Sequence, residues 1–144
     1  MIEREFDILV VEDSIDDYEI MSHVLEERQI RFLHVKDGAD ALQYIFSEKS
    51  ISHQIHNDLG LILLDLNLPK INGLEVLRKV RNDKRTHNVP VVVLSSTDDS
   101  REIVKAYDLG ANSFVVKPME FEKFVNTVQA ISSYWTRVNR KSIN

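Results

Sequence analysis

Several side chains able to do chemistry stand directly after short apolar runs of the sequence. Glu12 and Asp13 follow one run and Asp65 follows another, while Ser95 and Lys117 follow two more. Neighbouring carboxylates disfavour one another's ionisation, so a group of them with few counter-charges suits a hard divalent cation. We predict a Mg²⁺ ion held by Asp13 and Asp65, with Glu12 in support through water. The sequence has no Cys, and no His belongs to this group, which argues against zinc or copper.

This set of residues suits chemistry at phosphorus. A carboxylate beside Mg²⁺ and an ammonium group can attack a phosphoryl group, and the metal and Lys117 would neutralise the charge that develops on its oxygens. The Ser95 hydroxyl can hydrogen-bond a phosphoryl oxygen. Asp65 is the predicted nucleophile, because it ends the most apolar run, where its position is most rigid, and because the loop 66–69 keeps that side open.

The apolar runs themselves predict strands of a parallel sheet. They are too short for helices, mostly unbroken rather than alternating, and rich in Val, Ile and Leu, as strands buried on both faces are. The runs are Ile8–Val11, Leu59–Leu64, Val91–Leu94 and Phe114–Val116. A further segment, Arg31–Val35, alternates polar and apolar residues and predicts an edge strand.

Helical periodicity fills the intervals between the predicted strands. Helices are expected after Ser14, an N-cap with Asp17 in the capping-box position, and after Gly73. The other helical segments are Ala39–Ser47, 103–109 and 121–131. Strict alternation of strands and helices predicts a doubly wound α/β fold, in which side chains at the carboxyl ends of the strands meet at one edge. The segment Glu48–Asp58 is read as a surface loop.

Composition narrows the class of protein. The chain of 144 residues has the size of one domain, and its formal net charge of −5 gives no electrostatic drive toward nucleic acid. The absence of Cys excludes disulfides and thiolate chemistry. The apolar runs are too short for a membrane span, and charged residues follow Met1 at once. We expect a soluble, cytoplasmic protein with no direct membrane or nucleic-acid partner.

Ordered motifs along the chain resemble the receiver domain of bacterial two-component response regulators. They are Val11-Glu12-Asp13-Ser14, Leu64-Asp65-Leu66-Asn67-Leu68-Pro69-Lys70, Asn72-Gly73, Leu94-Ser95-Ser96 and Val116-Lys117-Pro118. Each motif is weak alone, but the set in this order and spacing is specific, and it spans the chain from Phe6 to about Ser132. The resemblance implies a flavodoxin-like receiver fold, a parallel sheet with strand order 2-1-3-4-5.

The resemblance also implies a role for each residue of the acidic group. Asp65 matches the phosphoacceptor of the family, and Lys117 matches its invariant lysine. Glu12 and Asp13 match its acidic pair. Asn67 matches the residue whose backbone carbonyl completes the Mg²⁺ shell. These roles agree with the chemistry that the residue types suggest on their own.

Further positions match the residues that respond to phosphorylation in this family and are called its switch residues. Ser95 matches the switch hydroxyl and Phe114 the aromatic switch, which is often Tyr elsewhere. A Phe can rotate inward but cannot make the hydrogen bond of a Tyr. Asn67 and Thr97 occupy the two positions that tune hydrolysis of the phosphoryl group. Pro118 matches a residue that follows a cis peptide bond in this family.

The same resemblance implies an organisation and a set of partners. We expect a receiver domain over 1–133, a tail over 134–144 that serves as a dimerisation arm, and no output domain. Three features resemble regulators paired with phytochrome histidine kinases: the Leu-Asn-Leu-Pro-Lys motif at 66–70, the segment Glu48–Asp58 and the pair Tyr134-Trp135. The expected partners are therefore a sensor histidine kinase, in particular a bacteriophytochrome, and a second copy of the chain.

The predicted function is a phosphorylation switch rather than a metabolic enzyme. A histidine kinase donates a phosphoryl group to Asp65, the domain catalyses only its own phosphorylation and dephosphorylation, and the fourth and fifth helical segments with the strand between them change their surface. A phosphorelay intermediate or phosphate sink is the alternative. A phosphatase of the haloacid dehalogenase type ranks low, because position 67 is Asn where that chemistry needs an acid. A flavodoxin-like FMN carrier ranks low because the loop after the first run is acidic.

Other polar and aromatic residues receive ordinary interpretations. Asp16 and Asp17 are expected to cap a helix and complement its dipole. His34 receives no chemical role. Tyr107 belongs either to the core or to a partner surface. Trp135 falls where the core should end, so an exposed Trp at an interface is expected there.

Overall fold

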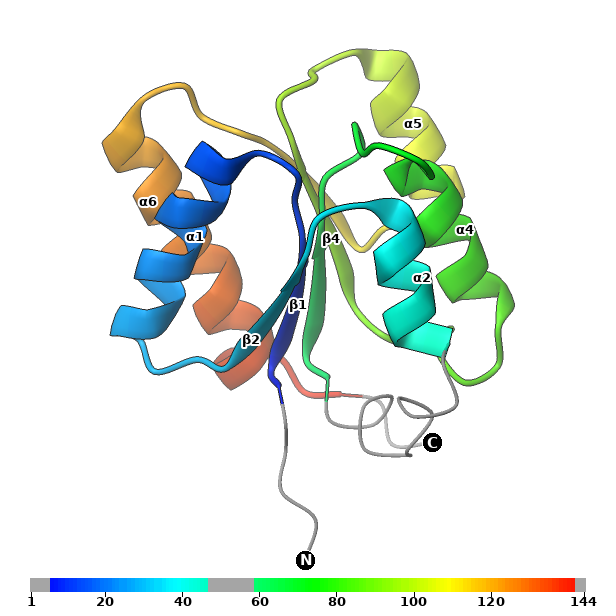
Figure 1. The fold of residues 1–144 in the computed structure, drawn as a ribbon, viewed down its shortest axis with the longest axis horizontal. Helices are drawn as coiled ribbons and strands as arrows, with labels where there is room; N and C mark the ends of the chain where they lie inside the picture. The colour runs from blue at the N-terminus through cyan, green and yellow to red at the C-terminus, as the bar shows by residue number, and fades with distance from the viewer. Residues whose placement is uncertain (1–5, 47–58, 142–144) are drawn as a thin grey trace, which may run out of the picture.

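A parallel five-stranded sheet forms the centre of the molecule in the computed structural model, which describes residues 6–46 and 59–141. Its strands are β1 (Ile8–Val11), β2 (Phe32–Val35), β3 (Leu61–Leu64), β4 (Val91–Ser95) and β5 (Ser113–Val116). They lie in the order β2-β1-β3-β4-β5, and every neighbouring pair is parallel (Figure 1). The predicted fold class and strand order are confirmed.

Helices cover both faces of the sheet. The first and last α-helices, α1 (Ile15–Glu27) and α6 (Phe121–Ser133), pack together on one face. The opposite face carries α2 (Gly38–Phe46), α4 (Gly73–Asn82) and α5 (Ser100–Asp108). The loops at the carboxyl ends of the strands gather at one end of the molecule, at the top of Figure 1, and the chain enters β1 from the other end.

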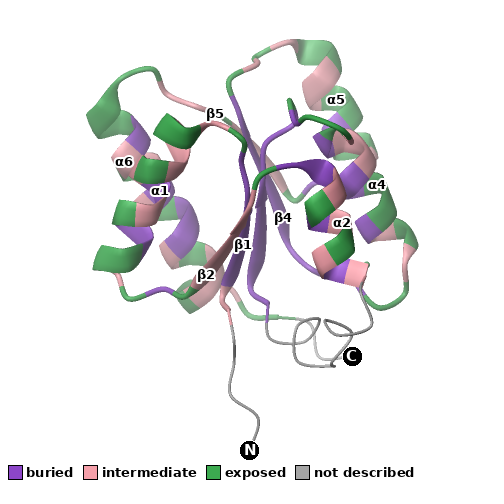
Figure 2. Cartoon of the chain, in the orientation of Figure 1, coloured by how far each residue is buried: buried purple, intermediate pink, exposed green. Residues whose placement is uncertain are grey.

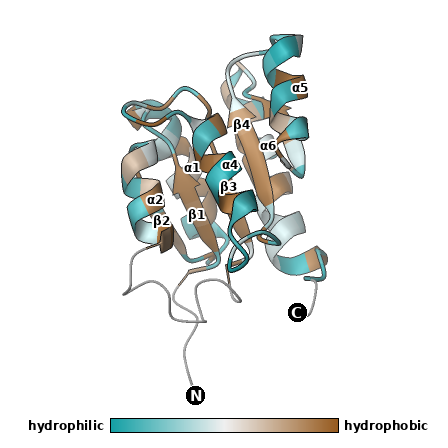
Figure 3. Cartoon of the chain, turned by 90° about the vertical axis from the view of Figure 1, so that its right-hand side faces the viewer, coloured by the Kyte–Doolittle hydropathy of each residue, from teal (hydrophilic) through white to brown (hydrophobic). Residues whose placement is uncertain are grey.

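The core consists of two apolar clusters separated by the sheet. Alternate residues of β1 point to opposite faces, so Ile8 and Val10 join the cluster under α1 and α6, while Leu9 and Val11 join the cluster under α2 and α4. All residues of β1, β3 and β4 are buried (Figure 2). The central strands are largely apolar, whereas the helices mix hydrophilic and apolar residues (Figure 3). Burial on both faces explains why the apolar runs in the sequence are unbroken.

Some predicted boundaries need correction. The strand β5 is partly exposed, because it has β4 on one side and no neighbouring strand on the other, so the expectation that Phe114–Val116 is buried on both faces is wrong. The strand β3 begins at Leu61 rather than Leu59, although Leu59 is buried. The segment Glu48–Asp58 lies outside the described residues.

The chain continues past α6 in a π-helix, η1 (Tyr134–Val138), that is attached to the body. Trp135 is partly buried and packs against the core cluster under α1 and α6, which corrects the expectation of an exposed interface residue. The Arg137 guanidinium donates a hydrogen bond to the backbone carbonyl of Arg28, with a separation of 2.6 Å. Tyr134 and Val138 remain exposed. In the described part of the chain, none of the helices has both the length and the apolarity to cross a bilayer.

The start of α4 lies in close contact with the loop that follows β3. The N–H of Gly73, the first residue of α4, donates to the carbonyl of Leu66 at 2.8 Å. A Cβ at Gly73 would lie 2.7 Å from Leu66 Cα and would collide with the carbonyl oxygen of Asp65. Only a residue without a side chain allows α4 to start so close to the loop that carries Asp65.

Replacing Gly73 with Ala is therefore expected to destabilise the fold. Helix propensity alone would favour Ala over Gly by about 1 kcal/mol, but the clash with backbone atoms should outweigh this and lower the free energy of unfolding by about 1–3 kcal/mol. Urea denaturation measures the difference. Ser100→Ala, an exposed first residue of α5, is the control and should change stability by less than about 0.5 kcal/mol. A Gly73→Ala variant as stable as wild type would contradict the close approach.

The start of α2 depends on an ionised carboxylate. One Asp37 oxygen accepts a hydrogen bond from the Asp40 N–H at 2.7 Å, and the other lies 3.4 Å from the Lys70 ammonium nitrogen. The bond from Asp40, followed by that from Lys70, lowers the pKa of Asp37 below its ordinary value. The ionised form of Asp37 therefore stabilises the folded state.

This pKa shift predicts a dependence of stability on pH. Because the folded-state pKa is lowered, the contribution of Asp37 is complete above the unfolded-state pKa of about 3.9 and is lost as the pH falls through the folded-state value. Asp37→Asn should lower stability at pH 7, and the difference from wild type should shrink below about pH 4. Urea unfolding at several pH values measures it. A difference that does not vary with pH would show that the charge is not responsible.

Candidate functional site

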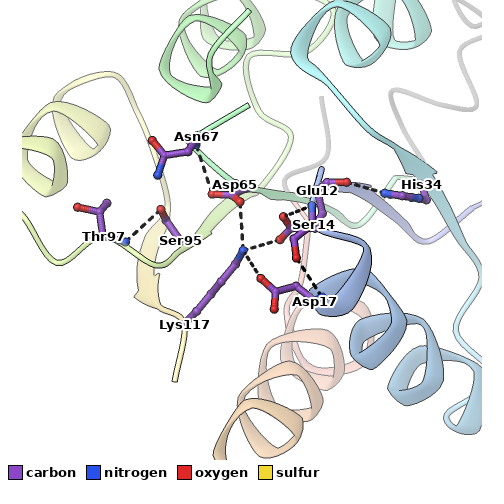
Figure 4. Close-up of polar contacts among 9 residues, drawn as sticks. All are labelled: Glu12, Ser14, Asp17, His34, Asp65, Asn67, Ser95, Thr97 and Lys117. Carbon is purple, nitrogen blue, oxygen red and sulfur yellow. Dashed lines mark hydrogen bonds and ion pairs between the residues drawn. The ribbon is translucent and has the colours of Figure 1, made fainter. Parts of the chain in front are cut away.

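The polar residues predicted from the strand ends meet at one edge of the sheet (Figure 4). The strands β1 and β3 are neighbours, and Val11 is paired with Leu64. The N–H of Asp65 donates to the Val11 carbonyl at 3.0 Å, so Glu12 and Asp65 begin their loops side by side. Lys117 reaches the same place from the end of β5. Strand order and register alone thus assemble the group.

The three predicted acids form a compact cluster of oxygen atoms. One carboxylate oxygen from each of Glu12, Asp13 and Asp65 lies within 4.8 Å of the others. Glu12 and Asp65 are buried, whereas Asp13 is exposed, so the cluster is open to solvent on one side. A set of oxygen ligands with excess negative charge fits a hard divalent cation. The N–H of Asn67 donates to Asp65 Oδ1 at 3.4 Å, which places the loop after β3 against the cluster.

The Lys117 ammonium group lies among carboxylates. Its Nζ is 2.7 Å from Glu12 Oε1, 2.8 Å from Asp17 Oδ2 and 3.1 Å from Asp65 Oδ2. The Lys117 side chain is only 7 % exposed, which leaves little access for water. Burial alone would lower the pKa of Lys117, but the hydrogen bonds to Asp17 and Glu12 and the nearby negative charges raise it above its ordinary value. Lys117 is therefore a fixed positive charge.

The Glu12 carboxyl ionises less readily than an ordinary glutamate. Burial, and then the charge of Asp65, raise the pKa of Glu12 to about 8, although Lys117 acts in the opposite direction. Its second oxygen accepts a hydrogen bond from the Ser14 N–H at 3.1 Å. Positive charge added to this pocket would favour the ionised form of Glu12.

Sequence reasoning missed two contributors to this site. Ser14 caps α1 by accepting from the Asp17 N–H at 3.3 Å, as predicted, but the Asp17 carboxylate binds Lys117 instead of serving only the helix. His34 Nε2 donates to the Glu12 carbonyl at 2.7 Å, and its ring stacks on Tyr18 with centroids 3.6 Å apart. The available signal for Asp17 was its place in the first turn after β1, at the same edge of the sheet.

Of the two predicted switch residues, Ser95 lies beside this cluster (Figure 4). Ser95 is fully buried at the end of β4, and its Oγ accepts from the Thr97 N–H at 3.4 Å. Phe114 packs against the core cluster under α2 and α4. The N–H of Phe114 donates to the Tyr107 hydroxyl at 3.0 Å, which gives Tyr107 a contact with β5 that the sequence did not reveal. The Lys117–Pro118 bond is trans, the commoner isomer, so the expected cis bond is not found.

Comparison with known proteins identifies the family. A model described as the response regulator receiver domain matches residues 8–129. The chain belongs to the response regulator receiver family. This receiver is a signalling domain of two-component systems, as the resemblance implied, and its fold and acidic pocket agree with that assignment.

Individual relatives of this receiver are similar over most of their length. The chain is 33 % identical to the probable methanogenesis regulatory protein FilR2 of Methanothrix harundinacea over 96 % of this chain and 88 % of the relative. It is 32 % identical to response regulator Rcp1 of Synechocystis, over 89 % and 87 % of the two chains.

Solved structures agree with this assignment. The phosphorylated cyanobacterial phytochrome response regulator RcpA matches with a TM-score of 0.85 and 29 % identity, over 96 % of this chain and 99 % of that one. The Mn²⁺-bound form of Rcp1 matches with a TM-score of 0.82 and 29 % identity, over 94 % and 98 %.

The acidic cluster predicts that Mg²⁺ stabilises this receiver. A cation that binds only the folded protein raises the free energy of unfolding by about 2.7 kcal/mol when its free concentration is roughly 100 times its dissociation constant. Thermal unfolding with and without Mg²⁺ measures the increment. Asp13→Asn should remove most of it, because Asp13 is the exposed acid of the cluster, whereas Asp16→Asn, an exposed neighbour outside the cluster, should not. Equal increments in both variants would place the cation elsewhere.

Proposed function

We propose that this receiver accepts a phosphoryl group on Asp65 from a histidine kinase, with Mg²⁺ as its cofactor, and thereby changes the surface that it presents to a partner. The observation that carries the proposal is the contact of 3.1 Å between the Lys117 ammonium and Asp65 within the acidic cluster. A carboxylate next to a fixed ammonium and a cation site has the surroundings that transfer of a phosphoryl group requires.

The transfer begins with the Asp65 carboxylate. One carboxylate oxygen forms a bond to phosphorus while the bond from phosphorus to the kinase imidazole breaks. The imidazole keeps the electron pair and takes a proton from solvent. Hydrolysis later adds water to phosphorus, breaks the acyl phosphate bond, restores the carboxylate and releases inorganic phosphate together with the proton from water. The domain thus catalyses its own phosphorylation and dephosphorylation and acts on no separate metabolite.

The other residues of the site stabilise the charge of the phosphoryl group. Asp13 and Asp65, with the Asn67 carbonyl and with Glu12 through water, would hold Mg²⁺, which supplies positive charge to the phosphoryl oxygens. Lys117 donates to the phosphoryl group on Asp65 from its place beside the carboxylate. The Ser95 hydroxyl turns from its contact with the Thr97 N–H to donate to a phosphoryl oxygen.

The movement of Ser95 gives the signal a route to the surface. Phe114 follows Ser95 inward in the phosphorylated state, and the change reaches the face made by α5, β5 and α6. This face carries exposed apolar side chains, among them Val104, Tyr107 and Val116, so it suits a partner or a second copy of the receiver. The tail 134–144, with exposed Tyr134 and Val138, is proposed as a dimerisation arm that follows the receiver domain 1–133.

The kinase partner is proposed to be a phytochrome. The support is the similarity to RcpA, described as a phytochrome response regulator, and to a bacteriophytochrome response regulator, RtBRR, with 39 % identity. Because histidine kinases draw the phosphoryl group from ATP, we place the exchange in the cytoplasm.

A small phosphodonor tests the phosphoacceptor directly. Wild-type protein incubated with radiolabelled acetyl phosphate and Mg²⁺ should take up one label that is released by alkali, as an acyl phosphate is. Asp65→Asn should take up none, because its amide lacks the nucleophilic oxygen. Asp16→Asn, which changes an exposed aspartate in the first turn of α1, should be labelled like wild type.

Labelling of Asp65→Asn at the wild-type level would refute the assignment of Asp65. The same readout with phosphorylated kinases as donors tests the partner. A bacteriophytochrome kinase should transfer its label faster than kinases that sense other signals, and a slower transfer would remove the phytochrome from the proposal while leaving Asp65 in place.

A further inference from the structure

We infer that Asp17 is a positioning residue, which holds the Lys117 ammonium in the orientation needed for phosphoryl transfer to Asp65. The inference rests on the proposed function of Asp65. It concerns a residue outside the three acids that form the candidate cation site, since Asp17 is not a member of that cluster. Asp17 acts through Lys117 and does not itself contact the reacting carboxylate in any described interaction.

The first argument is the number of donors on the ammonium. A lysine ammonium has three N–H groups and no acceptor. Three carboxylates surround Lys117 Nζ at hydrogen-bonding distance, and they come from the end of β1, the first turn of α1 and the end of β3. The ammonium donates hydrogen bonds to Asp17 and Asp65, and it forms an ion pair with Glu12. Because the Lys117 side chain is 7 % exposed, water cannot readily replace a partner that is removed.

The second argument is that the three carboxylate partners of Lys117 differ in their other interactions. Glu12 and Asp65 belong to the acidic cluster, so their oxygens would also interact with a bound cation or carry the phosphoryl group. Asp17 stands apart, and its carboxylate stays available to Lys117 throughout the reaction. The lysine side chain is flexible and ends in a compact charge, and it lacks the planar guanidinium that orients the N–H groups of an arginine. A dedicated third partner fixes the direction in which the remaining N–H groups point.

The third argument is that Asp17 is itself well fixed. Its N–H is bound to the Ser14 hydroxyl oxygen, and its side chain is 28 % exposed. The helix α1 is anchored to the core by its buried residues, among them Met21 and Leu25. The adjacent Asp16 has the same charge but is exposed, and no described hydrogen bond involves its side chain. The two aspartates form a natural pair for comparison.

Phosphorylation kinetics distinguish positioning from a general effect of charge. With acetyl phosphate as donor, Asp17→Ala should lower the maximal rate of labelling by about tenfold, because a displaced catalytic group loses reaction geometry. Asp17→Asn keeps an acceptor oxygen at the same place and should lose less. If Asp17 acted only through its negative charge, its removal would instead lower the half-saturating concentration of the donor, because acetyl phosphate is an anion. Asp16→Ala controls for that charge, and its maximal rate should equal that of wild type.

A spectroscopic measurement tests the contact without phosphorylation. In protein labelled with ¹⁵N-lysine and free of Mg²⁺, the Lys117 ammonium resonance is assigned by its loss in Lys117→Met. Asp17→Asn should shift this resonance, and Asp16→Asn should leave it unchanged. Asp17→Asn serves here because it preserves the size of the side chain, so the measurement does not depend on how well the Ala variant folds.

The outcomes separate this inference from the proposed function. Wild type that is labelled on Asp65, together with an Asp17→Ala variant of unchanged maximal rate and an unmoved Lys117 resonance in Asp17→Asn, would overturn the inference and leave the proposed function standing. Wild type that takes up no label would overturn the proposed function and remove the reaction that Asp17 is inferred to serve. A lower maximal rate and a shifted resonance, both absent from the Asp16 controls, support the inference.

Discussion

The interaction on which the site depends is the ion pairing of one buried lysine with several carboxylates. Glu12 and Asp65 lie side by side and are both buried, so negative charges on the two side chains repel each other strongly. The Lys117 ammonium offsets part of that repulsion and remains protonated because of it. Burial, and then the charge of Asp65, still hold the pKa of Glu12 well above its ordinary value. Such a pocket is suited to bind a cation, which in turn would offset the negative charge of a phosphoryl group.

The parallel sheet provides this arrangement through register alone. Because β1 and β3 are paired residue for residue up to Val11 and Leu64, the next residues of both strands leave the sheet at the same height. Lys117 approaches across β4 from the far edge, and only a long side chain can cover that distance. Around this core, α4 begins directly behind the loop that carries Asp65, where Gly73 permits contact between backbones. The positions of the reactive groups are thus set by the most buried parts of the molecule.

Sequence patterns predicted what depends on burial and on strand ends. Unbroken apolar runs gave the central strands, and the polar residues after them gave the acids and Lys117, because parallel strands bring their carboxyl ends together. The sequence pattern of one segment does not show which side chains of other helices and strands contact it in the fold. For that reason Asp17 was interpreted as a helix residue, and the contact of His34 with the Glu12 carbonyl was not foreseen. Trp135 was misjudged because its burial depends on packing against the core under α1 and α6.

The hydrogen bond between the Tyr107 hydroxyl and β5 protects the edge of the sheet against aggregation. An outermost strand normally presents unpaired N–H groups, which other polypeptides can use to extend the sheet and aggregate. Here the hydroxyl of an α5 side chain occupies the N–H of Phe114 in the middle of that strand. A foreign strand would have to displace the tyrosine before it could add to the sheet. This hydrogen bond therefore disfavours continuous sheets between molecules.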